Sequence, residues 1–60
     1  MTTELKLLIE AIILFRNRRK LSQQTEEEYK IECDIAEYLT TTGNYQLYLD
    51  ISSGKKQIDD

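Results

Sequence analysis

The 60-residue sequence contains no proline, no histidine and no tryptophan, and it has two glycines and one cysteine. Because proline is absent and glycine is scarce, the composition favours long uninterrupted helices over a turn-rich β fold. A single cysteine excludes a disulfide within the chain, and one thiol without histidine cannot form a conventional zinc site. We therefore expect neither a metal nor any other cofactor.

A chain this short forms one small domain and buries only about 60% of its unfolded surface. A core of that size supplies roughly 3–5 kcal/mol, so small domains usually need a further source of stability. With disulfides and metals excluded, helix packing and self-association remain. The size of the chain therefore predicts an oligomer.

The apolar run over residues 5–15 is too short to span a bilayer, which requires about 20 apolar residues. It contains Lys6 and Glu10, and the basic cluster follows the run instead of preceding it as in a signal peptide. We expect a cytoplasmic protein with no membrane association. The alternative, an interfacial membrane helix, is less favoured because the polar face of this segment is sparse.

Residues 3–20 predict a first helix. Thr2 or Thr3 can cap it, Glu4 lies in its first turn, and the basic cluster lies at its C-terminal end. Acidic residues at the start and basic residues at the end are the order that the helix dipole favours.

The apolar residues of this helix form two stripes instead of one. The first comprises Leu5, Leu8, Ile9, Ile12 and Phe15, and the second comprises Leu7, Ala11 and Leu14, with Ile13 beside them. A helix that is apolar nearly all round must be covered nearly all round. Two further short elements can hardly do that, so we expect a homodimer with this helix at its centre and the first stripe at the interface.

Residues 25–42 predict a second helix. Thr25 and Glu28 have the spacing of a capping box, although Ser22 is a competing cap. Gly43 follows where a left-handed C-terminal cap belongs. The connection of about five residues is typical of an antiparallel helical hairpin.

The hairpin offers an explanation for the basic cluster, which comprises Arg16, Arg18, Arg19 and Lys20. Antiparallel packing brings these residues close to the acidic start of the second helix, Glu26, Glu27 and Glu28. We prefer this interpretation to nucleic-acid binding, because the net charge is −3 and no reading motif is present. The other acids of the second helix, Glu32 among them, are interpreted as a solvated face instead of a catalytic pair or a phosphate mimic.

Residues 44–58 are ambiguous. The stretch "NYQLYLDIS" alternates as a strand does, and a turn at "SSGKK" would allow a second short strand. It can equally form a short helix capped by Asn44 and ended by Gly54, and we favour the helix because an isolated hairpin is marginal. We expect one domain over residues 1–53 and a flexible tail over residues 54–60.

The expected fold is therefore all-α: an antiparallel helical hairpin with a short C-terminal element, assembled as a homodimeric bundle. No catalytic residues are recognisable, and Cys33 is interpreted as a small buried core residue and not as a nucleophile. We expect a non-enzymatic regulator or inhibitor that binds a larger protein, of the kind found among bacterial regulators and phage accessory proteins. The expected partner-binding residues are Tyr38, Tyr45, Leu47, Tyr48 and Leu49. The alternative is a small nucleic-acid-binding protein that uses Arg16, Arg18, Arg19 and Lys20.

Overall fold

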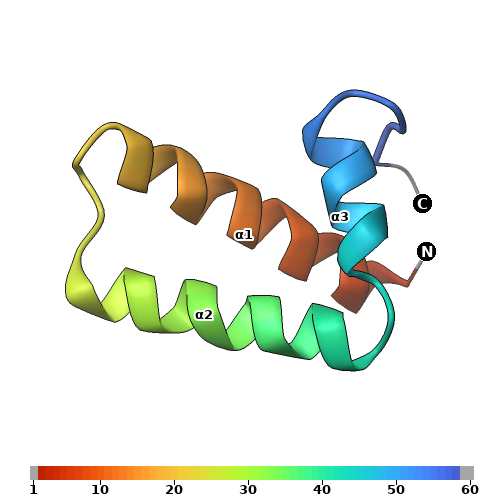
Figure 1. Cartoon of the computed structure of the whole chain (residues 1–60), viewed down its shortest axis with the longest axis horizontal. Helices are drawn as coiled ribbons and strands as arrows, with labels where there is room; N and C mark the ends of the chain where they lie inside the picture. Colours follow the sequence, from red (N-terminus) through yellow and green to blue (C-terminus); the bar gives the residue numbers. More distant parts are fainter. Residues whose placement is uncertain (1, 59–60) are drawn as a thin grey trace.

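The computed structural model describes residues 2–58 of the chain. Within that range the chain forms three helices and no strand: α1 (Thr3–Lys20), α2 (Glu26–Thr41) and α3 (Tyr45–Ser52). α1 and α2 run side by side in opposite directions, and α3 packs at the open end of this hairpin, where both ends of the described part of the chain also lie (Figure 1). The predicted helical hairpin is confirmed, and the ambiguous third element is a helix.

Side-chain caps encoded in the local sequence mark where the first two helices begin. Thr2 caps α1, because its hydroxyl accepts a hydrogen bond from the backbone N–H of Leu5 at 3.1 Å. Thr25 and Glu28 form the complete capping box at α2, with hydrogen bonds of 3.1 and 3.0 Å. Asn44 precedes α3 but does not cap it; its side-chain amide donates to the Thr42 hydroxyl instead.

All three helices end in the same hydrogen-bonded motif. Immediately after each helix cap, one residue has a positive φ: 58° at Ser22, 78° at Gly43 and 86° at Gly54. The following residue then donates its backbone N–H back to the last turn of the helix, at 2.8 Å in each case: Gln23 to Arg18, Asn44 to Leu39 and Lys55 to Asp50. This is the Schellman arrangement, which satisfies carbonyls that a helix end leaves unpaired. Ser22 therefore belongs to the C-terminal capping motif of α1, one residue after the cap Leu21, and is not the N-terminal cap of α2, which is Thr25.

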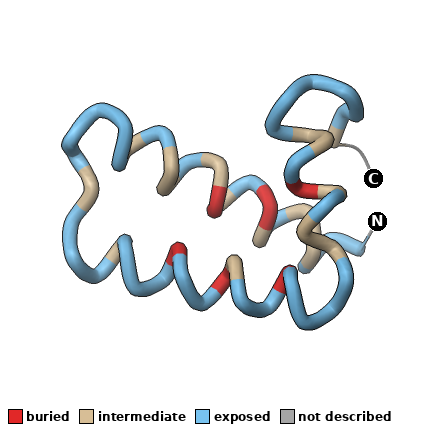
Figure 2. Tube along the Cα trace, in the orientation of Figure 1, coloured by how far each residue is buried: buried red, intermediate tan, exposed pale blue. Residues whose placement is uncertain are grey.

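The core is small and takes residues from every helix. The buried apolar residues are Ile9 and Ile12 of α1, Ile35 and Leu39 of α2, and Tyr48 of α3 (Figure 2). Partly buried apolar residues surround them, including Leu5, Leu8 and Phe15. Ile58 also packs against this core, so part of the segment expected to be a flexible tail contacts the domain.

The Ser22 position generates a first prediction. A non-glycine residue in the left-handed region costs about 1–2 kcal/mol, so we expect Ser22→Gly to raise the free energy of unfolding by about 1 kcal/mol. Urea denaturation followed by circular dichroism measures this change.

The matched control is Gly43→Ala, which adds the same backbone penalty at the end of α2. Nothing lies within 4 Å of a Cβ at Gly43, so this change tests the backbone alone. It is expected to lower the free energy of unfolding by about 1 kcal/mol. If both variants changed the free energy of unfolding in the same direction, the left-handed backbone at Ser22 would not be a source of strain.

Candidate functional site

Three polar side chains, Arg16, Arg19 and Gln24, converge on one buried carboxylate. Glu32 of α2 is only 3% exposed. Its Oε2 atom accepts a hydrogen bond from Arg16 Nε at 3.0 Å and lies 3.1 Å from Arg19 Nη2. Its Oε1 atom accepts a hydrogen bond from the Gln24 amide at 2.8 Å, and the same amide also donates to the Phe15 carbonyl.

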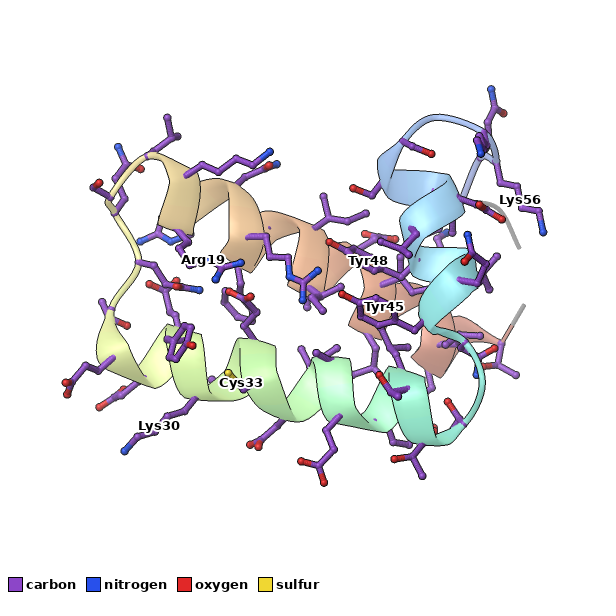
Figure 3. All side chains as sticks on the ribbon, viewed as in Figure 1. Arg19, Lys30, Cys33, Tyr45, Tyr48 and Lys56 are labelled. Carbon is purple, nitrogen blue, oxygen red and sulfur yellow. The ribbon has the colours of Figure 1, made fainter. Side chains whose placement is uncertain are left out.

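Arg16 extends this arrangement to the third helix. Its Nη1 atom donates to the hydroxyl oxygens of Tyr45 and Tyr48, at 2.9 and 3.0 Å. The guanidinium carbon also lies 5.0 Å from the centroid of the Tyr48 ring and 5.7 Å from that of Tyr45, within the range of cation–π attraction. Both tyrosines point from α3 toward the middle of the hairpin (Figure 3). We call this set, Arg16, Arg19, Gln24, Glu32, Tyr45 and Tyr48, the Glu32 network.

The surroundings of two glutamates lower their pKa values. Burial alone raises the pKa of Glu32, but the hydrogen bonds from Gln24 and Arg16 and the charges of Arg19 and Arg16 outweigh it, so its pKa lies below the ordinary value. The pKa of Glu28 is lowered first by the backbone N–H of Thr25 and then by Arg18, whose Nε atom lies 2.8 Å from the Glu28 carboxylate. Both side chains are therefore carboxylates at neutral pH.

These contacts revise the expected partners of the basic cluster. Of the three glutamates at the start of α2, only Glu28 pairs with an arginine, Arg18, while Glu26 and Glu27 are exposed. Arg16 and Arg19 pair with Glu32 instead. The interpretation of Glu32 as part of a solvated face was wrong, because this position is on the side of α2 that packs against α1.

The residues expected to bind a partner are divided between core and surface. Tyr48 is buried, and Tyr45 and Leu47 are half-buried against the core. Tyr38 and Leu49 remain on the surface, 46% and 40% exposed. Sequence spacing alone could not separate these five residues, because the separation depends on how α3 docks on α2.

Cys33 also differs from expectation, since it is exposed and not part of the core. It lies two residues before Ile35, which places it about 200° from that buried residue around the helix. The hydrophobic character of its thiol alone was therefore not a sufficient reason to predict that Cys33 is buried in the core.

The two apolar stripes of α1 have different environments. Members of the first stripe, which was expected to form the dimer interface, pack inside the chain: Ile9 and Ile12 have no exposed surface, and Leu5, Leu8 and Phe15 lie against the core. In the second stripe, Leu7 and Leu14 are 59% and 56% exposed, whereas Ala11 and the neighbouring Ile13 pack partly against the core. A dimer built on α1 must therefore use the second stripe.

A further exposed surface lies on α2. Ile31 and Tyr38, both 46% exposed, are two turns apart on one side of the helix, and the exposed acids Glu27 and Asp34 share that side at helical spacing. We call Glu27, Ile31, Asp34 and Tyr38 the α2 face. It alternates carboxylates with large apolar side chains, and of these four residues only Tyr38 was expected to bind a partner.

Within residues 2–58, no group of three or more potential ligands is placed to hold a metal ion. No helix in the same range has the length and apolarity needed to cross a membrane. Comparison with known protein families, with curated proteins and with solved structures found no match. The evidence on function is therefore the geometry of the chain itself.

The Glu32 network generates a second prediction. A carboxyl whose pKa is lower in the folded chain contributes stability above its unfolded pKa, and this contribution is lost as the pH falls through the folded pKa. We expect Glu32→Gln to lower the free energy of unfolding at neutral pH by about 2 kcal/mol, because Arg16 and Arg19 lose their charged acceptor. The variant should also lose less stability than the wild type between neutral pH and about pH 3.

Urea denaturation at the two pH values measures both effects. Glu37→Gln makes the same chemical change at an exposed position of α2 and is expected to alter stability by less than about 0.5 kcal/mol. Equal losses in the two variants would show that the buried carboxylate has no special role.

Proposed function

We propose that this protein is a small non-enzymatic regulator or inhibitor that acts by occupying a surface of a larger protein. The observation that carries the proposal is the α2 face, on which Ile31 and Tyr38 are each nearly half exposed although the chain has a well-formed core. Tyrosine is favoured at protein interfaces because it offers a large rigid apolar surface with a polar tip.

The chemistry of the α2 face defines the kind of partner. Glu27 and Asp34 lie on either side of Ile31, and Tyr38 follows, so the face combines two apolar contact points with two negative charges. A complementary surface has shallow apolar pockets flanked by lysine or arginine. Leu49 of α3 is a further exposed apolar residue available to such a partner.

The positions of the reactive groups support binding over catalysis. Four side chains of the Glu32 network are hydrogen-bonded through Arg16 and connect the three helices: Glu32, Arg16, Tyr45 and Tyr48. Groups engaged in this way serve the fold and are not free to meet a substrate. The enzyme hypothesis therefore receives no support from the Glu32 network.

Nucleic-acid binding through the basic cluster is the alternative, and it is less well supported. Arg16, Arg18 and Arg19 each have a glutamate partner within the chain. A phosphate backbone would have to compete with these carboxylates for the same guanidinium groups. Lys20 alone offers little electrostatic affinity.

A capture experiment tests the proposal. Immobilised wild-type protein is exposed to a bacterial lysate with and without nuclease, and bound proteins are identified by mass spectrometry. We expect one protein to be recovered in both conditions and to be lost with the double variant Ile31→Ala, Tyr38→Ala. It should be retained with Leu7→Ala, which shortens an even more exposed apolar residue on α1.

The purified target then permits a quantitative measurement. Tyr38→Ala is expected to weaken binding at least about tenfold in calorimetry, since tyrosines that become buried in a protein interface are frequent hot spots of binding energy. Recovery that disappears with nuclease would favour the nucleic-acid alternative. Recovery that is unaffected by the double variant would place the binding surface elsewhere.

A further inference from the structure

The two leucines of the second apolar stripe of α1, Leu7 and Leu14, are used neither by the core nor by the proposed function, and Ala11 between them is partly exposed at the edge of the core. We call Leu7, Ala11 and Leu14 the α1 outer stripe. Its two leucines are more than half exposed, and Leu21, which follows the helix seven residues after Leu14, is 67% exposed. Residues seven apart lie within about 20° of one another around a helix, so these leucines form one continuous face.

We propose that the α1 outer stripe is a symmetric interface with a second copy of this chain, in which the two α1 helices pack antiparallel and cross beside Ala11. A two-fold interface requires that a surface be complementary to itself. An axis between residues 10 and 11 places Leu7 of each copy opposite Leu14 of the other. The smallest side chain of the stripe, Ala11, then lies at the crossing, where the two backbones approach most closely.

The charges on α1 select the antiparallel orientation. Glu4 lies in the first turn, while Arg18, Arg19 and Lys20 lie in the last turn. Antiparallel packing brings Glu4 of one copy close to Arg18 of the other, whose side chain is 38% exposed although it also pairs with Glu28. It also aligns the two helix dipoles favourably. Parallel packing would place the two basic ends side by side.

The size of the stripe predicts a weak dimer. α1 has 18 residues and is therefore about 27 Å long, close to the 29 Å longest dimension of the molecule. Contact through one such helix buries less than the roughly 800 Å² that each partner contributes to a standard interface. The two Glu10 side chains also lie close together beside the axis and repel each other. We therefore expect a dissociation constant in the micromolar range.

Sedimentation equilibrium of the full chain, from about 1 µM to about 1 mM, tests the interface. The wild type is expected to change from monomer to dimer in this range. Leu14→Glu should weaken the dimer by at least about tenfold, because it places a charge opposite Leu7. Leu49→Glu, the same change at an exposed leucine on α3, should leave it unchanged, and Glu10→Gln should strengthen it by removing the repulsion at the axis.

Circular dichroism of each variant shows whether the helices remain intact, which is expected because Leu14, Leu49 and Glu10 are exposed. A wild type that is monomeric at every concentration overturns the proposal. So does a dimer that Leu14→Glu leaves intact.

Cysteine cross-linking tests the orientation. The native thiol is first removed as Cys33→Ser, which is an exposed position, and either Ala11→Cys or Leu7→Cys is then introduced. Of these two positions, only residue 11 lies beside the two-fold axis and therefore close to its own counterpart, so Ala11→Cys should form a covalent dimer under mild oxidation, whereas Leu7→Cys should not. Equal cross-linking of both variants, or none with Ala11→Cys, contradicts the antiparallel crossing.

The α1 outer stripe and the α2 face are on different helices. The sedimentation and cross-linking experiments therefore test the dimer independently of whether a larger protein is captured through Tyr38. Conversely, a monomeric wild type would leave the proposal for the α2 face unchanged.

Discussion

Burial of the Glu32 carboxylate is the constraint on which the rest of the structure depends. Removing a charge from water is costly unless opposite charges and hydrogen bonds compensate for it. Arg16, Arg19 and Gln24 supply that compensation, and they come from the end of α1 and the connection after it. Because Arg16 also holds the hydroxyls of Tyr45 and Tyr48, one buried carboxylate sets the register of the hairpin and the position of α3.

This arrangement decides which surfaces remain for function. The network engages the arginines that a phosphate backbone would need, and it draws the tyrosines of α3 into the interior. Two surfaces with exposed apolar residues remain available, the α1 outer stripe and the acidic α2 face. Because these interactions stabilise the core and occupy the arginines, the surfaces that remain suit a protein partner better than a nucleic acid.

Local signals were sufficient to predict most of the secondary structure. The capping box of Thr25 and Glu28 marked the start of α2, and Gly43 marked its end, because both act through hydrogen bonds within a few residues. Glu32 and Cys33 were assigned to the wrong environments. Their residue types suggested an exposed acid and a buried thiol, whereas the packing of α2 against α1 places the carboxylate inside and the thiol outside.

The sequence by itself determined the first two helices, the antiparallel hairpin and the excess of apolar surface on α1, since these follow from periodicity, capping and loop length, whereas it left residues 44–58 undecided between helix and strand. Only the tertiary structure decided which stripe of α1 enters the core, which carboxylate the arginines bind, and which tyrosines stay on the surface. The physical reason is that these choices depend on the rotation of each helix about its axis. That rotation is fixed by contacts between residues 16 to 32 positions apart, such as those of Arg16 with Glu32 and Tyr48.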